Sequence, residues 1–300
     1  MAVPNFQEIT LPLLRLAGDG NVWALVDARH RLAEHFQLSQ EEQEELLPSG
    51  RQRRFANRVA WAKVYLQRGG LLTSPNRGQF QISERGRNVL GDPPAGITIK
   101  FLDQFPEFRE FRNRSADSTN SESAEAGDSE TPEEVLETAY ATIRKNLASE
   151  LLDRVKSSSP RFFEQLVVEL LLTMGYGRAG GGAGEAVGRS GDEGIDGVIA
   201  EDRLGLEMVY LQAKRWEGTV GRPEIQKLVG ALHGRRARKG VFITTSSFSA
   251  DAVDYVTTID PKVALVDGAQ LAEFMIDFGI GVSAAQAYEV KKVDSDYFEE

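Results

Sequence analysis

The sequence contains no cysteine and no long apolar run. Without thiols the chain forms neither a disulfide framework nor a thiolate metal site, and it needs no oxidising compartment. The N-terminal residues MAVPNFQEIT lack a basic region followed by an apolar stretch, and Glu169 interrupts the most apolar helical pattern, at residues 166–174. We therefore expect a cytoplasmic protein that is neither exported nor inserted into a membrane.

Residues 115–134 lack aromatic residues, large aliphatic residues and bases, but include seven acids. Such a segment has too little apolar surface to offset the entropy lost on ordering. With 300 residues, 41% of them hydrophobic, the chain is long enough for two domains. We expect domains at residues 1–92 and 132–285, an acidic, serine-rich linker at 93–131 and a tail at 286–300.

The formal net charge of −10 argues at first sight against a polyanionic partner. The distribution of charge matters more, because residues 51–87 hold nine Lys or Arg and one acid, and residues 212–239 hold eight against two. This pattern is typical of a protein that contacts nucleic acid through both halves. That each basic segment is simply a solvated face remains the alternative.

In the first half, apolar residues at helical spacing predict several helices, of which the last and most basic spans about residues 53–67. Two short strands around a Pro/Asn/Gly turn follow it, so a mainly helical, winged-helix domain is expected. Its last helix and hairpin tip would contact double-stranded DNA, and an exposed helix of a protein-interaction domain is the alternative. The DNA-binding candidates are Arg53, Arg54, Asn57, Arg58 and Arg77.

In the second half, residues 175–197 hold ten glycines, but no Gly-Lys-Ser/Thr follows them and no helix pattern begins directly after them. These absences argue against a nucleotide P-loop and a dinucleotide site. The loop is expected to let backbone approach DNA or to carry Asp192 toward a site. Upstream, residues 160–174 form a helix pattern in which Glu164 lies at the edge of the apolar stripe, where its carboxylate needs a partner or a metal.

Two predicted strands, GIDGVIA at residues 194–200 and MVYLQAKRW at 208–216, carry the most specific pattern. Alternation puts Gln212 and Lys214 on one face of the second strand, and pairing of the two strands would place Asp196 beside Gln212. A carboxylate, an amide oxygen and an ammonium together suit metal-assisted phosphodiester hydrolysis. An ordinary ion pair between Asp196 and Lys214 is the structural alternative.

Further strand patterns at GVFITT and KVALVDG are each followed by a helix pattern. Strands that alternate with helices predict an α/β domain with a mixed or parallel sheet covered on both faces. Thr244, Thr245 and Ser246 end one of these strands, and we expect them to cap the following helix rather than to touch phosphate.

The strings FFEQLVVELL, GDEGIDGVI, LQAKRW, KGVFITTSSFSADA and LVDG together resemble the Mrr restriction endonucleases, a branch of the PD-(D/E)xK nuclease superfamily. The N-terminal half, including the helix that contains NRVAWA, resembles their DNA-reading winged-helix domain. The resemblance implies a restriction-endonuclease-like fold. It also implies a methylation-dependent, type IV enzyme that cleaves foreign methylated DNA with Mg²⁺.

The resemblance implies that Asp196 is an acidic metal ligand, Gln212 a metal ligand in the D/E position, and Lys214 the catalytic lysine. Glu164 matches an acidic position on the helix before the sheet. Gln212 departs from the general superfamily pattern but agrees with this branch, and a neutral amide holds a cation less well than a carboxylate. Whether one or two Mg²⁺ ions bind, and whether Glu164 or Asp192 supplies compensating charge, stays open.

Two other functions remain open. A DNA-binding regulator with an inactive nuclease fold is favoured by Gln212 and opposed by Asp196 and Lys214, and a branched-DNA or repair nuclease would use the same chemistry. Since one active site per chain cuts one strand, a double-strand endonuclease is expected to be a homo-oligomer, a dimer or a tetramer.

Overall fold

In the computed structural model, residues 2–76, 78–116, 129–177, 195–202 and 206–291 are described. The chain divides into one compact unit of Met1–Thr142 with Lys291–Glu300, and another of Ile143–Val290. The division falls within one long helix, α8 (Pro132–Ser157). No helix of the described residues is long and apolar enough to cross a membrane.

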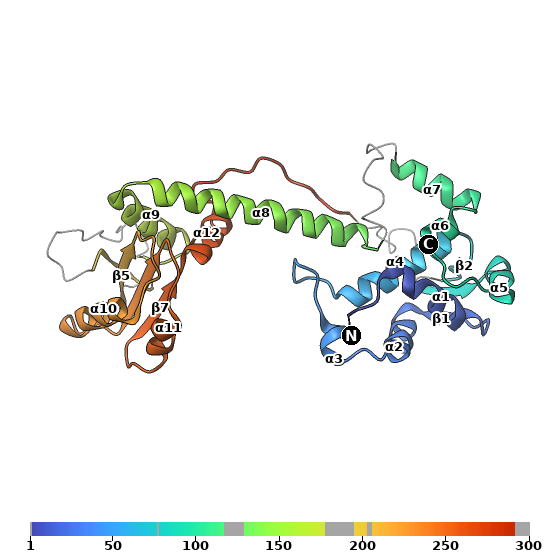
Figure 1. Ribbon diagram of the computed structural model, residues 1–300, viewed down its shortest axis with the longest axis horizontal. Coiled ribbons are helices and arrows are strands. Elements are labelled where there is room, and N and C mark those ends of the chain that lie inside the picture. The colour runs from blue at the N-terminus through green and yellow to red at the C-terminus, as the bar shows by residue number, and fades with distance from the viewer. Residues whose placement is uncertain (1, 77, 117–128, 178–194, 203–205, 292–300) are drawn as a thin grey trace. The chain divides into compact units, whose positions relative to one another are not determined.

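The first unit is mainly helical and includes a three-stranded antiparallel sheet in the order β1-β3-β2 (Figure 1). The β2–β3 hairpin lies where two strands were predicted, with Leu72 paired to Ile82. The first unit contains α1 (Phe6–Ala17), β1 (Trp23–Ala24), α2 (Leu25–His35), α3 (Gln40–Glu44), α4 (Arg54–Arg68), β2 (Leu72–Thr73), β3 (Gln79–Ile82), α5 (Glu84–Gly91), α6 (Ile99–Leu102) and α7 (Pro106–Ala116).

The prediction of a linker at residues 93–131 was wrong for the first part of this range. There α6 and α7 form, and Ile97, Leu102 and Phe108 are buried in the same core as α1 and α4. The apolar residues of ITIKFLDQF, with Phe108 and Phe111 just after them, supply the buried surface that orders this stretch. The helical unit therefore continues well beyond residue 92.

The second unit has the predicted α/β architecture: a four-stranded mixed sheet in the order β4-β5-β6-β7, in which β4 is antiparallel to β5 and the other pairs are parallel (Figure 1). Its strands are β4 (Gly197–Ala200), β5 (Met208–Lys214), β6 (Lys239–Thr244) and β7 (Lys262–Val266). Its helices, besides the second half of α8, are α9 (Pro160–Thr173), α10 (Arg222–Gly234), α11 (Ala250–Thr257) and α12 (Gly268–Asp277).

Helices cover both faces of this sheet, because successive residues of each strand point to opposite sides. Leu211 and Ile243 pack into the core formed with α8, α9 and α12. Tyr210 and Phe242 pack into the core formed with α10 and α11. Gln212 and Lys214 follow Tyr210 at intervals of two, so they lie on the α10 side of β5, at the carboxyl end of the strand.

Gly268, at the start of α12, lies close against the end of β6. A Cβ at this position would meet the backbone oxygen of Thr245 at 2.5 Å. We predict that Gly268→Ala destabilises the protein by about 1–3 kcal/mol, because the helix or the strand must shift. Gly230→Ala is the matched control: nothing lies within 4 Å of that Cβ, and alanine in an exposed helix stabilises by about 0.5–1 kcal/mol. Equal stabilities of the two variants in urea unfolding would contradict the prediction.

Candidate active site

Asp196 immediately precedes β4 and is tied to β5 by two hydrogen bonds. Its backbone N–H donates to the carbonyl of Leu211 at 2.8 Å, and its side-chain Oδ2 accepts from the backbone N–H of Ala213 at 2.8 Å. Both partners flank Gln212, so the Asp196 carboxylate is held at the edge of β5 next to that residue. The other carboxylate oxygen, Oδ1, is not used by this contact.

The side chain of Gln212 is buried, with 7% of its surface exposed. Its amide oxygen is inaccessible and has no hydrogen-bond partner among the described residues. A buried polar oxygen without a partner is costly, by roughly 1–3 kcal/mol. Such an oxygen beside a carboxylate fits a hard cation such as Mg²⁺, which takes oxygen ligands.

The pKa of Asp196 is raised above its ordinary value of 3.8, chiefly because burial disfavours the charged form. The hydrogen bond from Ala213 and the charge of Lys214 lower this pKa, whereas the negative charge of Glu164 raises it. Glu164, on α9, is thus close enough to Asp196 to repel it. Two carboxylates that repel each other in a half-buried position are stabilised by a bound cation.

Lys214 is held by residues that sequence reasoning did not single out. Its ammonium donates to Oε2 of Glu224, in the first turn of α10, and lies 4.4 Å from the centre of the Trp216 ring. The alternative of an ordinary Asp196–Lys214 ion pair is therefore not what the structure contains. The sequence does carry a signal for Glu224, because it is the one acid in the first turn of α10, within a basic segment.

Among the described residues, no group of three His, Cys, Asp or Glu side chains could hold a metal. The candidate ligand set is therefore mixed, with the carboxylates of Asp196 and Glu164 and the amide oxygen of Gln212. Asp192 lies outside the described residues.

Thr244, Thr245 and Ser246 were expected to cap the following helix, but Ser249 occupies the cap of α11. The Thr244 hydroxyl instead donates to the carbonyl of Lys214 at 2.9 Å. The Thr245 hydroxyl donates to the carbonyl of Trp216 and accepts from its N–H. Both threonines are buried, so they fix the backbone on either side of the end of β5.

In the first unit, α4 carries the DNA-binding candidates at its start. The side chain of Arg53 is 55% exposed and lies 3.8 Å from Glu44. Arg54 lies 2.5 Å from Glu45 and 3.6 Å from Glu134. Arg77 lies outside the described residues.

Asn57 and Arg58 were expected to contact DNA, but in the structure their side chains contact other residues of the protein. Asn57 is 1% exposed, and its side-chain oxygen accepts from the hydroxyl of Thr131 at 2.5 Å. Arg58 donates to Oε1 of the buried Glu134 at 2.9 Å and to the carbonyls of Val3 and Pro4. In this conformation the side chains of Asn57 and Arg58 are occupied by the protein itself.

The first two turns of α8 make two further contacts, one with α4 and one with the loop before it. The Trp61 indole N–H donates to Glu133, and Ser49 donates to Glu137 through its N–H and its hydroxyl. We call Thr131, Glu133, Glu134 and Glu137 the acidic turn.

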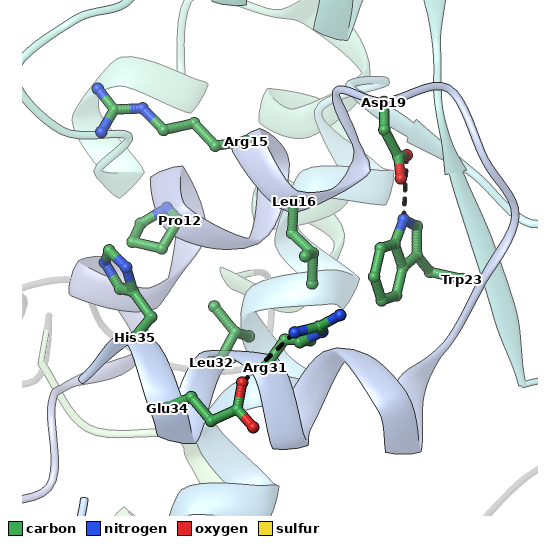
Figure 2. Close-up of a pocket in the computed structure, with 9 residues that line it drawn as sticks. All are labelled: Pro12, Arg15, Leu16, Asp19, Trp23, Arg31, Leu32, Glu34 and His35. Carbon is green, nitrogen blue, oxygen red and sulfur yellow. Dashed lines mark hydrogen bonds and ion pairs between the residues drawn. The ribbon is translucent and has the colours of Figure 1, made fainter. Parts of the chain in front are cut away.

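A separate hollow of about 740 Å³ lies between α1 and α2 of the first unit (Figure 2). Its wall includes Trp23, whose indole N–H donates to Asp19 at 3.1 Å, and Glu34, which lies 3.6 Å from Arg31. Because both acids are already engaged by neighbours, we assign the hollow no chemical role.

Comparisons with known proteins agree with the two-part organisation. Residues 6–92 match the family model of the Mrr N-terminal domain, and residues 155–275 match the model Mrr_cat, described as a restriction endonuclease. The chain is 37% identical, over 100% of both sequences, to the type IV methyl-directed restriction enzyme EcoKMrr of Escherichia coli (strain K12).

Two solved structures are also similar to the chain. The MspJI restriction endonuclease in complex with a 27-mer oligonucleotide is 20% identical, with a TM-score of 0.28, and the match covers 52% of this chain and 35% of MspJI. The DNA modification-dependent restriction endonuclease AspBHI is 14% identical, with a TM-score of 0.34, over 70% of this chain and 56% of AspBHI. At these TM-scores neither structure adds to the argument.

The raised pKa of Asp196 predicts a stability effect. Because the folded state binds this proton more tightly than the unfolded chain does, stability falls as pH rises from 3.8 to the raised pKa. At neutral pH without metal, Asp196→Asn should therefore raise the melting temperature, since its amide still accepts from Ala213. The gain should disappear below pH 3.8, where Asp196 is protonated in both states. Asp254→Asn, at an exposed position on α11, is the control, and a melting temperature no higher than the wild type's would refute the prediction.

Proposed function

The chain belongs to the Mrr family of restriction endonucleases, and from this premise we propose that it hydrolyses phosphodiester bonds of methylated DNA in a Mg²⁺-dependent reaction, as a type IV restriction enzyme. The observation that carries the proposal is the buried amide oxygen of Gln212, which has no hydrogen-bond partner in the described part of the chain and lies beside the Asp196 carboxylate. The name of the relative, a methyl-directed restriction enzyme, supports methylated DNA as the substrate.

In this proposal Asp196 and Gln212 hold the metal, and Glu164 adds a second negative charge to the site. When bound, Mg²⁺ neutralises charge on the scissile phosphate and acidifies its bound water. The protein fixes where this happens, because the hydrogen bonds of Asp196 with Leu211 and Ala213 hold its carboxylate next to Gln212.

Lys214 lies two residues beyond Gln212 on the same face of β5 and supplies the positive charge. An ammonium near the reacting phosphate stabilises the negative charge that develops on its oxygens. The threonine contacts to the backbone of Lys214 and Trp216 fix the start of this side chain. The buried Gln212 and the held Lys214 both favour a nuclease over a DNA-binding regulator.

The experiment is cleavage of matched methylated, unmethylated and four-way-junction DNA, with and without Mg²⁺. We expect the wild type to cut methylated DNA only with Mg²⁺, and Lys214→Ala to lose about 100-fold or more in rate, because a charge-stabilising donor is removed. Lys262→Ala, at an exposed lysine at the amino end of β7, is the control. Undiminished cutting by Lys214→Ala would exclude the proposed site, and preference for the junction would support a branched-DNA nuclease.

We further propose that the first unit is a winged-helix domain that positions the enzyme on double-stranded DNA through α4 and the β2–β3 hairpin. The exposed Arg53 is available for phosphate contacts, whereas Arg54, Asn57 and Arg58 contact the acidic turn. The acidic turn therefore presents carboxylates where phosphates would lie. We propose that DNA and the acidic turn compete for the start of α4.

Glu134→Gln tests this competition. The substitution removes a negative charge from the start of α4, so we expect DNA to bind roughly 3- to 10-fold more tightly, because one like-charge repulsion is lost. Arg54 keeps Glu45 as a partner, and Arg58 keeps the carbonyls of Val3 and Pro4. Glu150→Gln makes the same charge change at an exposed pair with Arg154 on α8 and should change affinity little. Thermal unfolding checks that both variants are folded. Equal or weaker DNA binding by folded Glu134→Gln would exclude competition.

We also propose that the active enzyme is a homo-oligomer, a dimer or a tetramer, because each chain carries one candidate site and a duplex has two strands. The cytoplasm, where foreign DNA is met, is the proposed location, and a sequence without cysteine suits its reducing conditions.

A further inference from the structure

The ammonium of Lys214 is held from two sides by residues of its own unit. Glu224 accepts a hydrogen bond from it, and the ring of Trp216 lies 4.4 Å away. A lysine side chain has four rotatable bonds, and holding it in one position costs conformational entropy. In this site the contacts with Glu224 and Trp216 order the side chain of Lys214 before any substrate binds.

Glu224 is itself fixed by its surroundings. It lies in the first turn of α10, where the helix dipole favours a negative charge, and only 13% of its side chain is exposed. Its second oxygen, Oε1, accepts from Lys227 at 2.7 Å, one turn further along the helix. The hydrogen bonds from Lys214 and Lys227 hold the pKa of Glu224 below its ordinary value of 4.5, so it stays ionised at neutral pH.

These contacts show that Glu224 has a different role from the candidate metal ligands. Both of its carboxylate oxygens are already bonded to ammonium groups, one to Lys214 and one to Lys227. No third acid joins Asp196 and Glu164 in a metal-binding group within the part of the chain that the structure describes. Glu224 is therefore placed to hold a lysine side chain rather than a metal ion.

We propose that Glu224 is a positioning residue for the reaction: with Trp216, it orients the Lys214 ammonium toward the scissile phosphate. The proposal rests on the proposed nuclease function. Lys214 and Lys227 together carry one more positive charge than Glu224 neutralises. This excess positive charge beside the metal ligands would attract a phosphate. Glu224 thereby contributes to the rate of the chemical step without touching the substrate.

Glu224→Gln removes the charge and keeps the shape. Because a misplaced catalytic group costs roughly 10- to 100-fold in rate, we expect kcat to fall by about that factor while KM for DNA and the affinity for Mg²⁺ stay within about twofold. Glu224→Asp should recover part of the loss, since it restores the charge. Glu217→Gln, which removes an exposed acid from the same segment, is the matched control and should cut like the wild type.

A second measurement does not depend on cleavage. The ¹⁵N relaxation of the Lys214 ammonium, with the signal assigned through Lys214→Arg, should show a restrained group in the wild type and a mobile one in Glu224→Gln. A changed KM with unchanged kcat, a loss of Mg²⁺ affinity, or an ammonium equally restrained in both proteins would overturn the positioning role. A wild type that cuts no DNA but shows the expected relaxation difference would reject the nuclease function and retain the Lys214–Glu224 contact.

Discussion

The hydrogen bond from the Ala213 N–H to the Asp196 carboxylate is the contact on which the candidate site depends. It joins the residue before β4 to the second strand of the sheet, at the point where the alternation of β5 presents Gln212 and Lys214. Because β4 and β5 are antiparallel neighbours, the carboxylate meets the carboxyl end of β5. A slip of one residue in this pairing would turn Gln212 and Lys214 to the opposite face.

Much of the second unit could be predicted because strand alternation is a local signal. The sequence pattern of β5 indicated which side chains share a face, and the alternation of strands with helices indicated a mixed sheet covered on both sides. Residues 93–116 show where the same reasoning failed. Their apolar residues directly precede an acidic stretch that indicates a linker, yet Phe108 lies in the core of the first unit.

Contacts between side chains of different elements could not be predicted in the same way. The Lys214–Glu224 ion pair depends on where α10 begins relative to the end of β5, which packing of the helix on the sheet decides. The burial of Asn57 likewise depends on Thr131, 74 residues away. Nothing in the pattern around Asn57 indicates Thr131, and the lone acid at the start of α10 indicates Glu224 without indicating that it pairs with Lys214.

The acidic turn also affects how ionic strength would act on DNA recognition. Dissolved ions weaken contacts between arginines and phosphates, but they would also stabilise the separated charges if DNA displaced Glu134 from Arg54 and Arg58. In the proposed mode of binding these two effects oppose each other at the same guanidinium groups. The slope of affinity against salt concentration would then understate the number of arginines that reach the DNA backbone.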